Sequence, residues 1–149
     1  MDEDAYGDIH RMAVLKSIDI FKELEIESLH QILKVAKYAK FAKDEMIVRK
    51  GEVGESFYVI LEGKAGVLID SSQDIITTIA RGGIIGELSI LDKKERTAWV
   101  IALEDMLVLE FDGEAFVSLI KTNNAIAFSM ARTLSQRLRN TFRTRKNTY

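Results

Sequence analysis

The sequence predicts an α+β fold in which a β-barrel or jelly roll lies between helices at the two ends of the chain. Apolar residues recur at three- and four-residue steps over residues 12–40 and 112–145, which is the spacing of amphipathic helices. Residues 41–111 instead contain short runs rich in β-branched and aromatic residues. With 149 residues, of which 47% are apolar, residues 1–149 have the length and the core-forming content of a single domain.

Residues 12–40 are predicted to form the N-terminal helices. Eight apolar residues follow the helical spacing: Leu15, Ile18, Phe21, Leu24, Leu29, Ile32, Leu33 and Ala36. Polar segments at residues 17–19 and 25–28 have the composition of helix caps or breaks. We therefore expect two or three short helices before residue 41.

The middle zone, residues 41–111, is predicted to form the β-structure. Its strand-like runs are residues 46–48, 57–61, 65–69, 75–79, 99–102 and 106–111. Polar or glycine-containing turns separate these runs at intervals of about ten residues, which is typical of an all-β barrel or jelly roll. A fold built from alternating strands and helices would need longer connections.

The last zone, residues 112–145, is predicted to form two C-terminal helices. Asp112 has the side chain and position of an N-cap for the first of them. The second is expected from about Asn124 to Thr144. Its apolar stripe consists of Ala127, Ala131, Leu134, Leu138 and Phe142.

The composition excludes several classes of protein. The chain has no cysteine, and His10 and His30 are its only histidines, so disulfides, thiolate metal sites and a thiol nucleophile are excluded. The serine and threonine residues lack a recognisable His–acid pair, so we expect no enzyme activity, no metal and no cofactor. No apolar run is long enough to span a membrane and the acidic start is no secretory signal, so a cytoplasmic location is expected.

Residues 86–96 suggest a binding site for a phosphate ester. Gly86 allows the backbone to approach a ligand closely, and a short helical turn at residues 88–91 would direct N–H groups at an anion. Arg96 could close over the same anion with its planar fork of donors. Glu87 supplies an acceptor for a sugar hydroxyl. Together these groups would hold the phosphate ester of a ribose.

Two motifs give the chain a resemblance to a known family. The first is KGEVGESFYVILEGKA at residues 50–65, and the second is GELS at residues 86–89 with RTA at residues 96–98. Over residues 12–145 the chain resembles the cyclic-nucleotide-binding domains of cAMP- and cGMP-dependent protein kinases and of bacterial catabolite activator proteins. The resemblance implies an eight-stranded, jelly-roll-like β-roll, N-terminal helices, a short phosphate-cassette helix and two C-terminal helices. The motif glycines Gly51, Gly54 and Gly63 are expected to serve turns.

The resemblance also assigns roles in binding cAMP or cGMP. It implies that Arg96 pairs with the cyclic phosphate and that Glu87 accepts a hydrogen bond from the ribose 2′-hydroxyl. The residues expected to complete the site around them are Gly86, Leu88, Ser89 and Ala98. At the position of Thr97, cAMP-selective kinase domains commonly have alanine, cGMP-selective ones threonine and bacterial activators serine. Thr97 is therefore compatible with both nucleotides, and we expect cAMP more than cGMP.

The final helix is the lid that the resemblance implies, with Arg137 and Leu138 placed to cap the base. Ligand that bridges the cassette and this helix would favour the closed form by a population shift. Because the chain stops at Tyr149, we expect no DNA-binding module and an unidentified effector protein as partner. The apolar stripe also favours a homodimer through the C-terminal helix.

Two alternatives remain open. The chain could be a degenerate family member that acts as a protein-interaction domain without nucleotide. It could also bind nucleic acid or a membrane through its basic final segment, because no acid follows Glu114. The basic residues in that segment are Lys121, Arg132, Arg137, Arg139, Arg143, Arg145 and Lys146.

Overall fold

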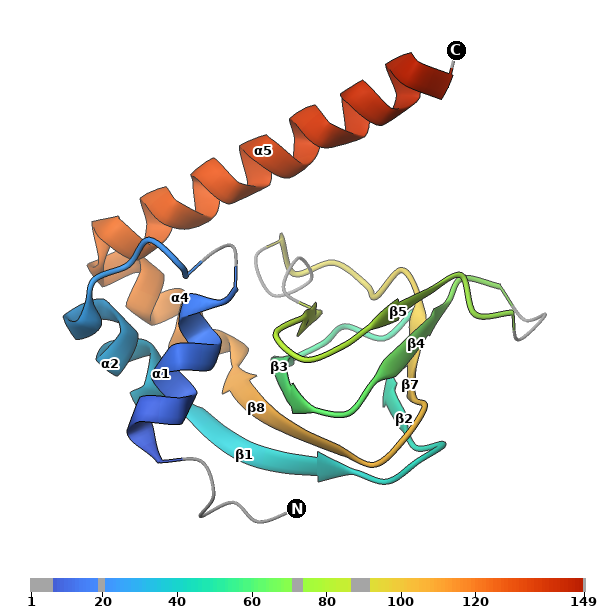
Figure 1. Cartoon of the computed structure of the whole chain (residues 1–149), viewed down its shortest axis with the longest axis horizontal. Helices are drawn as coiled ribbons and strands as arrows, with labels where there is room; N and C mark the ends of the chain where they lie inside the picture. Colours follow the sequence, from blue (N-terminus) through green and yellow to red (C-terminus); the bar gives the residue numbers. More distant parts are fainter. Residues whose placement is uncertain (1–6, 19–20, 71–73, 87–91, 149) are drawn as a thin grey trace.

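The protein folds into two β-sheets with helices before and after them (Figure 1). The computed structural model describes residues 7–18, 21–70, 74–86 and 92–148. Their strands are β1 (Ala36–Phe41), β2 (Met46–Val48), β3 (Ser56–Glu62), β4 (Ala65–Leu68), β5 (Thr77–Ile79), β6 (Ile84–Ile85), β7 (Trp99–Ala102) and β8 (Met106–Asp112). Their helices are α1 (Asp8–Lys16), α2 (Ile26–Lys34), α4 (Gly113–Thr122) and α5 (Asn124–Thr148). The predicted α+β class is confirmed.

The strands form two antiparallel four-stranded sheets. The first sheet has the order β1-β8-β3-β6 and the second has the order β2-β7-β4-β5. Neighbouring strands in each sheet are mostly distant in sequence, as in a roll rather than a simple meander. A hydrophobic core lies between the two sheets, where buried side chains from both sheets come together. Its residues are Val48, Ile60, Ala65, Ile85, Val100, Ala102, Met106 and Val108.

The helical prediction for residues 36–40 was wrong, because these residues form most of β1. The strand pairs with β8 in continuous register from Ala36 opposite Phe111 to Phe41 opposite Met106. Helix α2 ends at Lys34, with Val35 as its C-cap. Pairing with the seven-residue β8 overrides the helical spacing of the apolar residues here, since the long-range ladder gives hydrogen-bond partners to the backbone groups of β1 that face β8. The two-residue strand β6 was also missed, because two residues carry no detectable period.

The helices attach to the first sheet through a cluster of phenylalanine rings. Phe57 on β3 and Phe111 on β8 stack with 4.7 Å between ring centroids. Phe116 on α4 meets the Phe57 ring edge-on at 4.8 Å, and Phe21 meets Phe116 at 6.1 Å. These geometries are the favoured ones for aromatic pairs, so the cluster fixes α4 against both strands.

The predicted starts of the two C-terminal helices are confirmed. Asp112 caps α4, since its carboxylate accepts a hydrogen bond of 3.0 Å from the backbone N–H of Ala115. Helix α5 begins at Asn124 as predicted. Within the described ranges, no helix is both long and apolar enough to cross a bilayer.

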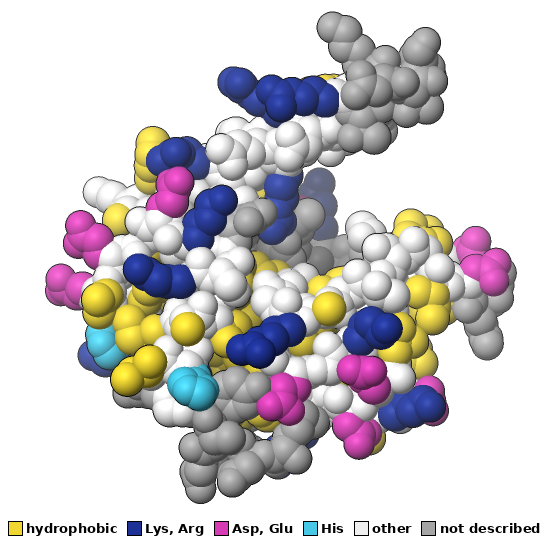
Figure 2. Space-filling view, in the orientation of Figure 1, with side chains coloured by type: hydrophobic (Ala, Val, Ile, Leu, Met, Phe, Trp, Pro, Cys, Tyr) yellow, Lys and Arg dark blue, Asp and Glu magenta, His cyan; other side chains and the backbone are white. Residues whose placement is uncertain are grey.

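Helix α5 buries a different face from the predicted stripe. Its buried side chains, all in the first three turns, are Ile126, Ser129, Met130 and Thr133. Of the predicted stripe, Ala127 and Leu134 are half-buried while Ala131, Leu138 and Phe142 are exposed. The later turns project from the body of the molecule, and Lys and Arg side chains (dark blue) lie along the helix (Figures 1 and 2). Only the turns that meet other elements select a buried face, so an apolar stripe alone does not locate it.

Truncating the central ring of the phenylalanine cluster should destabilise the fold strongly. Phe116 is 1% exposed, and we expect Phe116→Ala to lower the free energy of unfolding by about 3–5 kcal/mol, measured by urea denaturation. Phe128→Ala is the matched control, because Phe128 is 65% exposed; its effect should stay within about 0.5 kcal/mol. Equal losses in the two variants would contradict the cluster as the anchor of α4.

Candidate functional site

Arg96 is held by its backbone against the turn that precedes β3. Its N–H donates to the carbonyl oxygen of Glu52 at 2.8 Å, and its own carbonyl accepts from the N–H of Gly51 at 2.9 Å. An isolated antiparallel bridge between Val53 and Glu95 extends this pairing. The backbone of Arg96 is therefore fixed by these hydrogen bonds, independently of its side chain.

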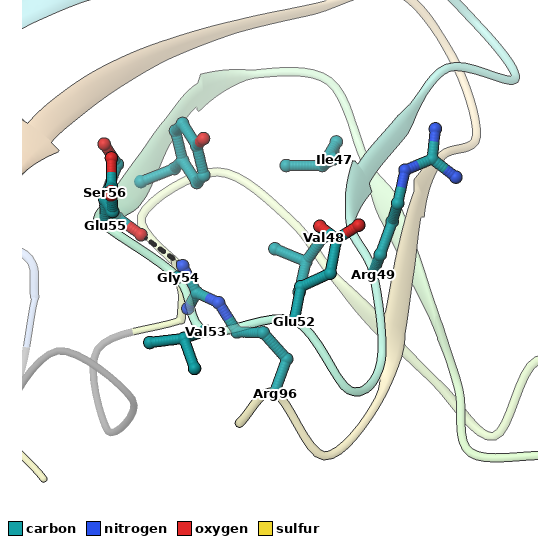
Figure 3. Close-up of a pocket in the computed structure, with 10 residues that line it drawn as sticks. Ile47, Val48, Arg49, Glu52, Val53, Gly54, Glu55, Ser56 and Arg96 are labelled. Atoms are coloured by element: carbon teal, nitrogen blue, oxygen red, sulfur yellow. Dashed lines mark hydrogen bonds between the residues drawn. The ribbon is translucent and has the colours of Figure 1, made fainter. Parts of the chain in front are cut away.

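The guanidinium of Arg96 is buried and oriented by two backbone carbonyls. The side chain is 7% exposed. Its Nη1 donates to the carbonyl oxygen of Gly86 at 2.8 Å, and its Nη2 donates to the carbonyl oxygen of Ser56, the contact dashed in Figure 3. Because one carbonyl follows β6 and the other begins β3, the fork is locked in one plane between segments of the first sheet.

Two glycines make room for this guanidinium. A Cβ atom at Gly54 would overlap with the guanidinium, and a Cβ at Gly86 would overlap with its Nη1. Gly86 also has a φ of 89°, which L side chains rarely adopt. Gly54 has no positive φ, so its missing side chain matters for space and not for backbone conformation.

The Arg96 side chain borders a cavity of about 290 Å³. Its other walls come from β2, from the turn after β2 and from the start of β3, and Figure 3 shows the labelled side chains around it. The lining residues are Ile47, Val48, Arg49, Glu52, Val53, Gly54, Glu55, Ser56, Tyr58 and Arg96. The cavity therefore combines a buried cation with apolar residues of β2 and with polar and charged residues of the turn before β3.

Among the side chains that line the cavity, Tyr58 has a raised pKa. Burial raises the pKa of the Tyr58 phenol above its ordinary value, and the nearby Glu110 carboxylate raises it further. The positive charge of Arg96 acts in the opposite direction. At neutral pH the hydroxyl is therefore protonated and available as a hydrogen-bond donor in the cavity.

The structure brings some of the predicted site residues together. Arg96 and Gly86, at the two ends of the second motif, are in direct contact, while the predicted contacts of both residues with a ligand stay predictions. Thr97 is exposed and Ala98 is half-buried directly after Arg96 in the chain, and neither lines the cavity. The remaining predicted residues Glu87, Leu88 and Ser89, with the predicted cassette helix at residues 88–91, lie outside the described residues.

The predicted lid residues on α5 are not part of this cavity. Its lining residues come from β2, β3, the turn between them and Arg96. Leu138 is 58% exposed on the projecting part of α5, and Arg137 is half-buried on the same helix. Base capping by these two side chains stays a prediction.

Sequence reasoning missed the role of Gly54 and the cavity walls formed by Ile47 and Tyr58. Gly51 and Gly63 do have positive φ values, of 88° and 99°, as expected of turn glycines. Gly54 was grouped with them because all three occur in one motif. Nothing in a single sequence distinguishes a glycine that permits a turn from one that makes room for a distant arginine.

The family to which these features point is also found by comparison with known proteins. A family model described as "Cyclic nucleotide-binding domain" matches residues 38–123. The chain belongs to this family. It is 26% identical over 128 residues to the "Cyclic AMP receptor protein" of Thermus thermophilus, covering 84% of this chain and 59% of that protein. It is 27% identical over 108 residues to a "cAMP-dependent protein kinase regulatory subunit" of Emericella nidulans, covering 72% of this chain and 26% of that protein. The chain thus spans about three fifths or less of these relatives.

Solved structures show the same fold. The N-terminal domain of a transcriptional regulator from Streptomyces coelicolor A3(2) superposes with a TM-score of 0.77 at 24% identity, covering 88% of this chain and 94% of that one. The regulatory domain of Toxoplasma gondii PKA, solved with cAMP, superposes with a TM-score of 0.70 at 21% identity, covering 80% of this chain and 46% of that one. The predicted β-roll and the predicted family are both confirmed.

Adding one methyl group at Gly54 should displace the Arg96 side chain. We expect Gly54→Ala to lower the free energy of unfolding by about 1–3 kcal/mol in urea titrations, because a side chain must move out of a packed site. Gly7→Ala is the control for steric overlap, since a Cβ at Gly7 meets nothing within 4 Å; because Gly7 is the N-cap of α1, a loss there of up to about 1 kcal/mol reports on the cap.

The same substitution tests whether Arg96 causes the loss. In an Arg96→Ala background the Gly54→Ala cost should shrink, giving a coupling energy of about 0.5–3 kcal/mol. Additive losses in the double-mutant cycle would contradict direct packing between the two residues.

Proposed function

We propose that this domain is a non-catalytic regulatory module that binds a cyclic nucleotide, cAMP in preference to cGMP, with the cyclic phosphate at Arg96. The observation that carries the proposal is the buried guanidinium, fixed by two carbonyls at the border of a cavity. Its similarity to a cyclic AMP receptor protein and to a cAMP-dependent protein kinase regulatory subunit supports a cAMP-responsive role.

The electrostatics of Arg96 suit a phosphate. Removing a cation from water is costly, and carbonyl dipoles offset only part of that cost. A phosphate beside the guanidinium would add charge-assisted hydrogen bonds to a planar fork that is already oriented. Preorganisation of this kind lowers the ordering cost of binding.

The rest of the cavity suits the sugar and the base. Its volume of about 290 Å³ is near the lower end of about 300–1,000 Å³ for small-molecule sites. Ile47, Val48 and the Tyr58 ring supply apolar walls, and the Tyr58 hydroxyl supplies a polar contact. In this proposal Glu87 accepts from the ribose 2′-hydroxyl, while Gly86, Leu88 and Ser89 provide backbone groups and Ala98 packs nearby.

The proposed regulatory step is closure of α5 over the bound nucleotide. In the structure the later turns of α5 project from the body, and among the described residues the cavity lining contains none from α5 (Figure 1). A base capped by Arg137 and Leu138 would bind the closed form more tightly than the open one and shift the population towards it. Coupling of about 1–3 kcal/mol is typical of such switches. An effector protein would sense the new position of α5.

Removing the Arg96 guanidinium should abolish most of the affinity. We expect Arg96→Ala to weaken cAMP binding by about 2–5 kcal/mol in calorimetric titrations, because a buried charge pair is lost. Arg49→Ala is the matched control: Arg49 lines the same cavity but is exposed, so its loss should cost about 1 kcal/mol or less.

Three results would contradict the proposal. Equal affinity of the Arg96→Ala variant and the parent would refute the phosphate assignment. Equal losses in both arginine variants would indicate binding by diffuse charge. No binding of cAMP or cGMP to the parent, after removal of co-purified nucleotide, would favour the protein-interaction alternative.

Thr97 tests the choice of nucleotide. We expect Thr97→Ala to lower the affinity for cGMP more than that for cAMP, because the hydroxyl can accept from the guanine amino group. Parallel titrations with both nucleotides measure the two losses. Equal losses would mean that Thr97 does not contact the base.

A further inference from the structure

The second sheet is apolar on its outer face as well as on its inner face. Along β4 and β7, alternate side chains face the inner core, and those between them face outward. The outward positions include Leu68 opposite Trp99, and Ile101 opposite Met46 on β2. In an antiparallel sheet that covers a core with one face, the other face is ordinarily polar. Four adjacent apolar residues there need another explanation.

These side chains line a groove of about 370 Å³. The lining residues are Asp44, Met46, Leu68, Asp70, Ile75, Trp99, Ile101 and Leu103. Ile75 is 46% exposed, and its neighbours Ile69 and Ile76 are 50% and 55% exposed. Contiguous exposed apolar surface of this kind marks an interaction site in a folded protein.

Gly66 in β4 lets two side chains of the groove lining pack close to the backbone of the strand. A Cβ at Gly66 would lie 3.2 Å from both the Ile75 and the Leu103 side chains, so these two converge over the bare backbone of β4. The groove is therefore a built feature of the sheet.

The charges of the groove are acidic. Asp44 and Asp70 are the charged members of its lining, and both are exposed. Lys50 lies at the edge, where its Nζ donates to the carbonyl oxygen of Ile69 at 2.7 Å and stands 5.3 Å from the centre of the Trp99 ring. A binding partner with apolar side chains flanked by Lys or Arg residues would complement this surface.

A second exposed apolar surface lies on the projecting part of α5 and is flanked by arginine residues. Leu138 and Phe142 are 58% and 60% exposed, four residues apart, and therefore lie on one side of the helix. Arg139 and Arg143 follow them directly and are also exposed. Figure 2 shows blue side chains along this helix, and yellow with magenta side chains at the end of the molecule where β4 and β5 turn.

We infer that the Leu138–Phe142 surface of α5 docks in the outer-sheet groove of a second copy of this chain. The groove lining includes no α5 residue of its own chain, so both apolar surfaces lack a partner within the described part of one molecule. Two apolar anchors one turn apart are the pattern with which a helix enters a groove. Pairing of two α5 helices would instead bring two acid-free, basic segments together, whereas the groove offers Asp44 and Asp70. The contact belongs to the nucleotide-free chain, because the proposed closure of α5 would move Leu138 from the partner's groove to the base.

Trp99 provides a direct readout, because it is the single tryptophan of the chain and lies in the groove. Sedimentation equilibrium and Trp99 emission are measured over one concentration series of the nucleotide-free full chain. Self-association and a blue shift of the emission should occur together, since docking removes water from the indole. Leu138→Asp should abolish both signals.

Charge reversal tests the orientation of the partners. Asp70→Lys should raise the dissociation constant of self-association about tenfold or more, because like charges then face each other. Combining Asp70→Lys with Arg139→Glu should recover most of the loss. Lys121→Glu on α4, which changes the charge by the same amount and sign as Arg139→Glu, is the control and should leave the constant within about twofold.

Three outcomes would overturn the inference. A chain that stays monomeric with unchanged Trp99 emission over the whole series lacks the contact. Self-association with unchanged emission and no response to Asp70→Lys would assign the contact to α5 pairing with α5. A blue shift that survives Leu138→Asp would show that another surface covers the groove.

Discussion

The structure depends most on the burial of the Arg96 guanidinium among backbone carbonyls. Arg96 leads into β7 of the second sheet, whereas the carbonyls of Ser56 and Gly86 belong to the ends of β3 and β6 in the first sheet. One side chain therefore connects the two sheets at the end where the cavity opens. The glycines at positions 54 and 86 are a consequence of this contact, because any Cβ there would occupy the space of the guanidinium.

This connection continues from the cavity to the C-terminal helices. Ser56 accepts the Arg96 hydrogen bond, and the next residue, Phe57, contacts the Phe116 ring on α4. Asn123 then joins α4 to α5 and contacts α2 through a hydrogen bond of 3.1 Å to Gln31. A continuous set of contacts therefore runs from Arg96 through β3 to α4 and to the start of α5.

The second sheet serves two surfaces with one set of strands. Its inward side chains close the core between the sheets, and its outward side chains form the apolar groove. The inward residues are buried in the core, whereas the outward residues Leu68, Trp99 and Ile101 are only half-buried. The groove and the Arg96 cavity share no lining residue, so the two surfaces can be perturbed separately.

The sequence by itself determined the order of helices, β-roll and helices, the family and the importance of Arg96. These features depend on local periodicity and on a spaced motif, both of which a single chain displays directly. Only the tertiary structure decided that residues 36–41 form a strand, because a distant ladder with β8 outweighs local spacing. It also decided that Gly54 makes room for Arg96 and that α5 buries Ile126 and Met130 instead of the predicted stripe. The physical reason is common to all three: each is settled by contact with residues far along the chain, and no local pattern records which residues those are.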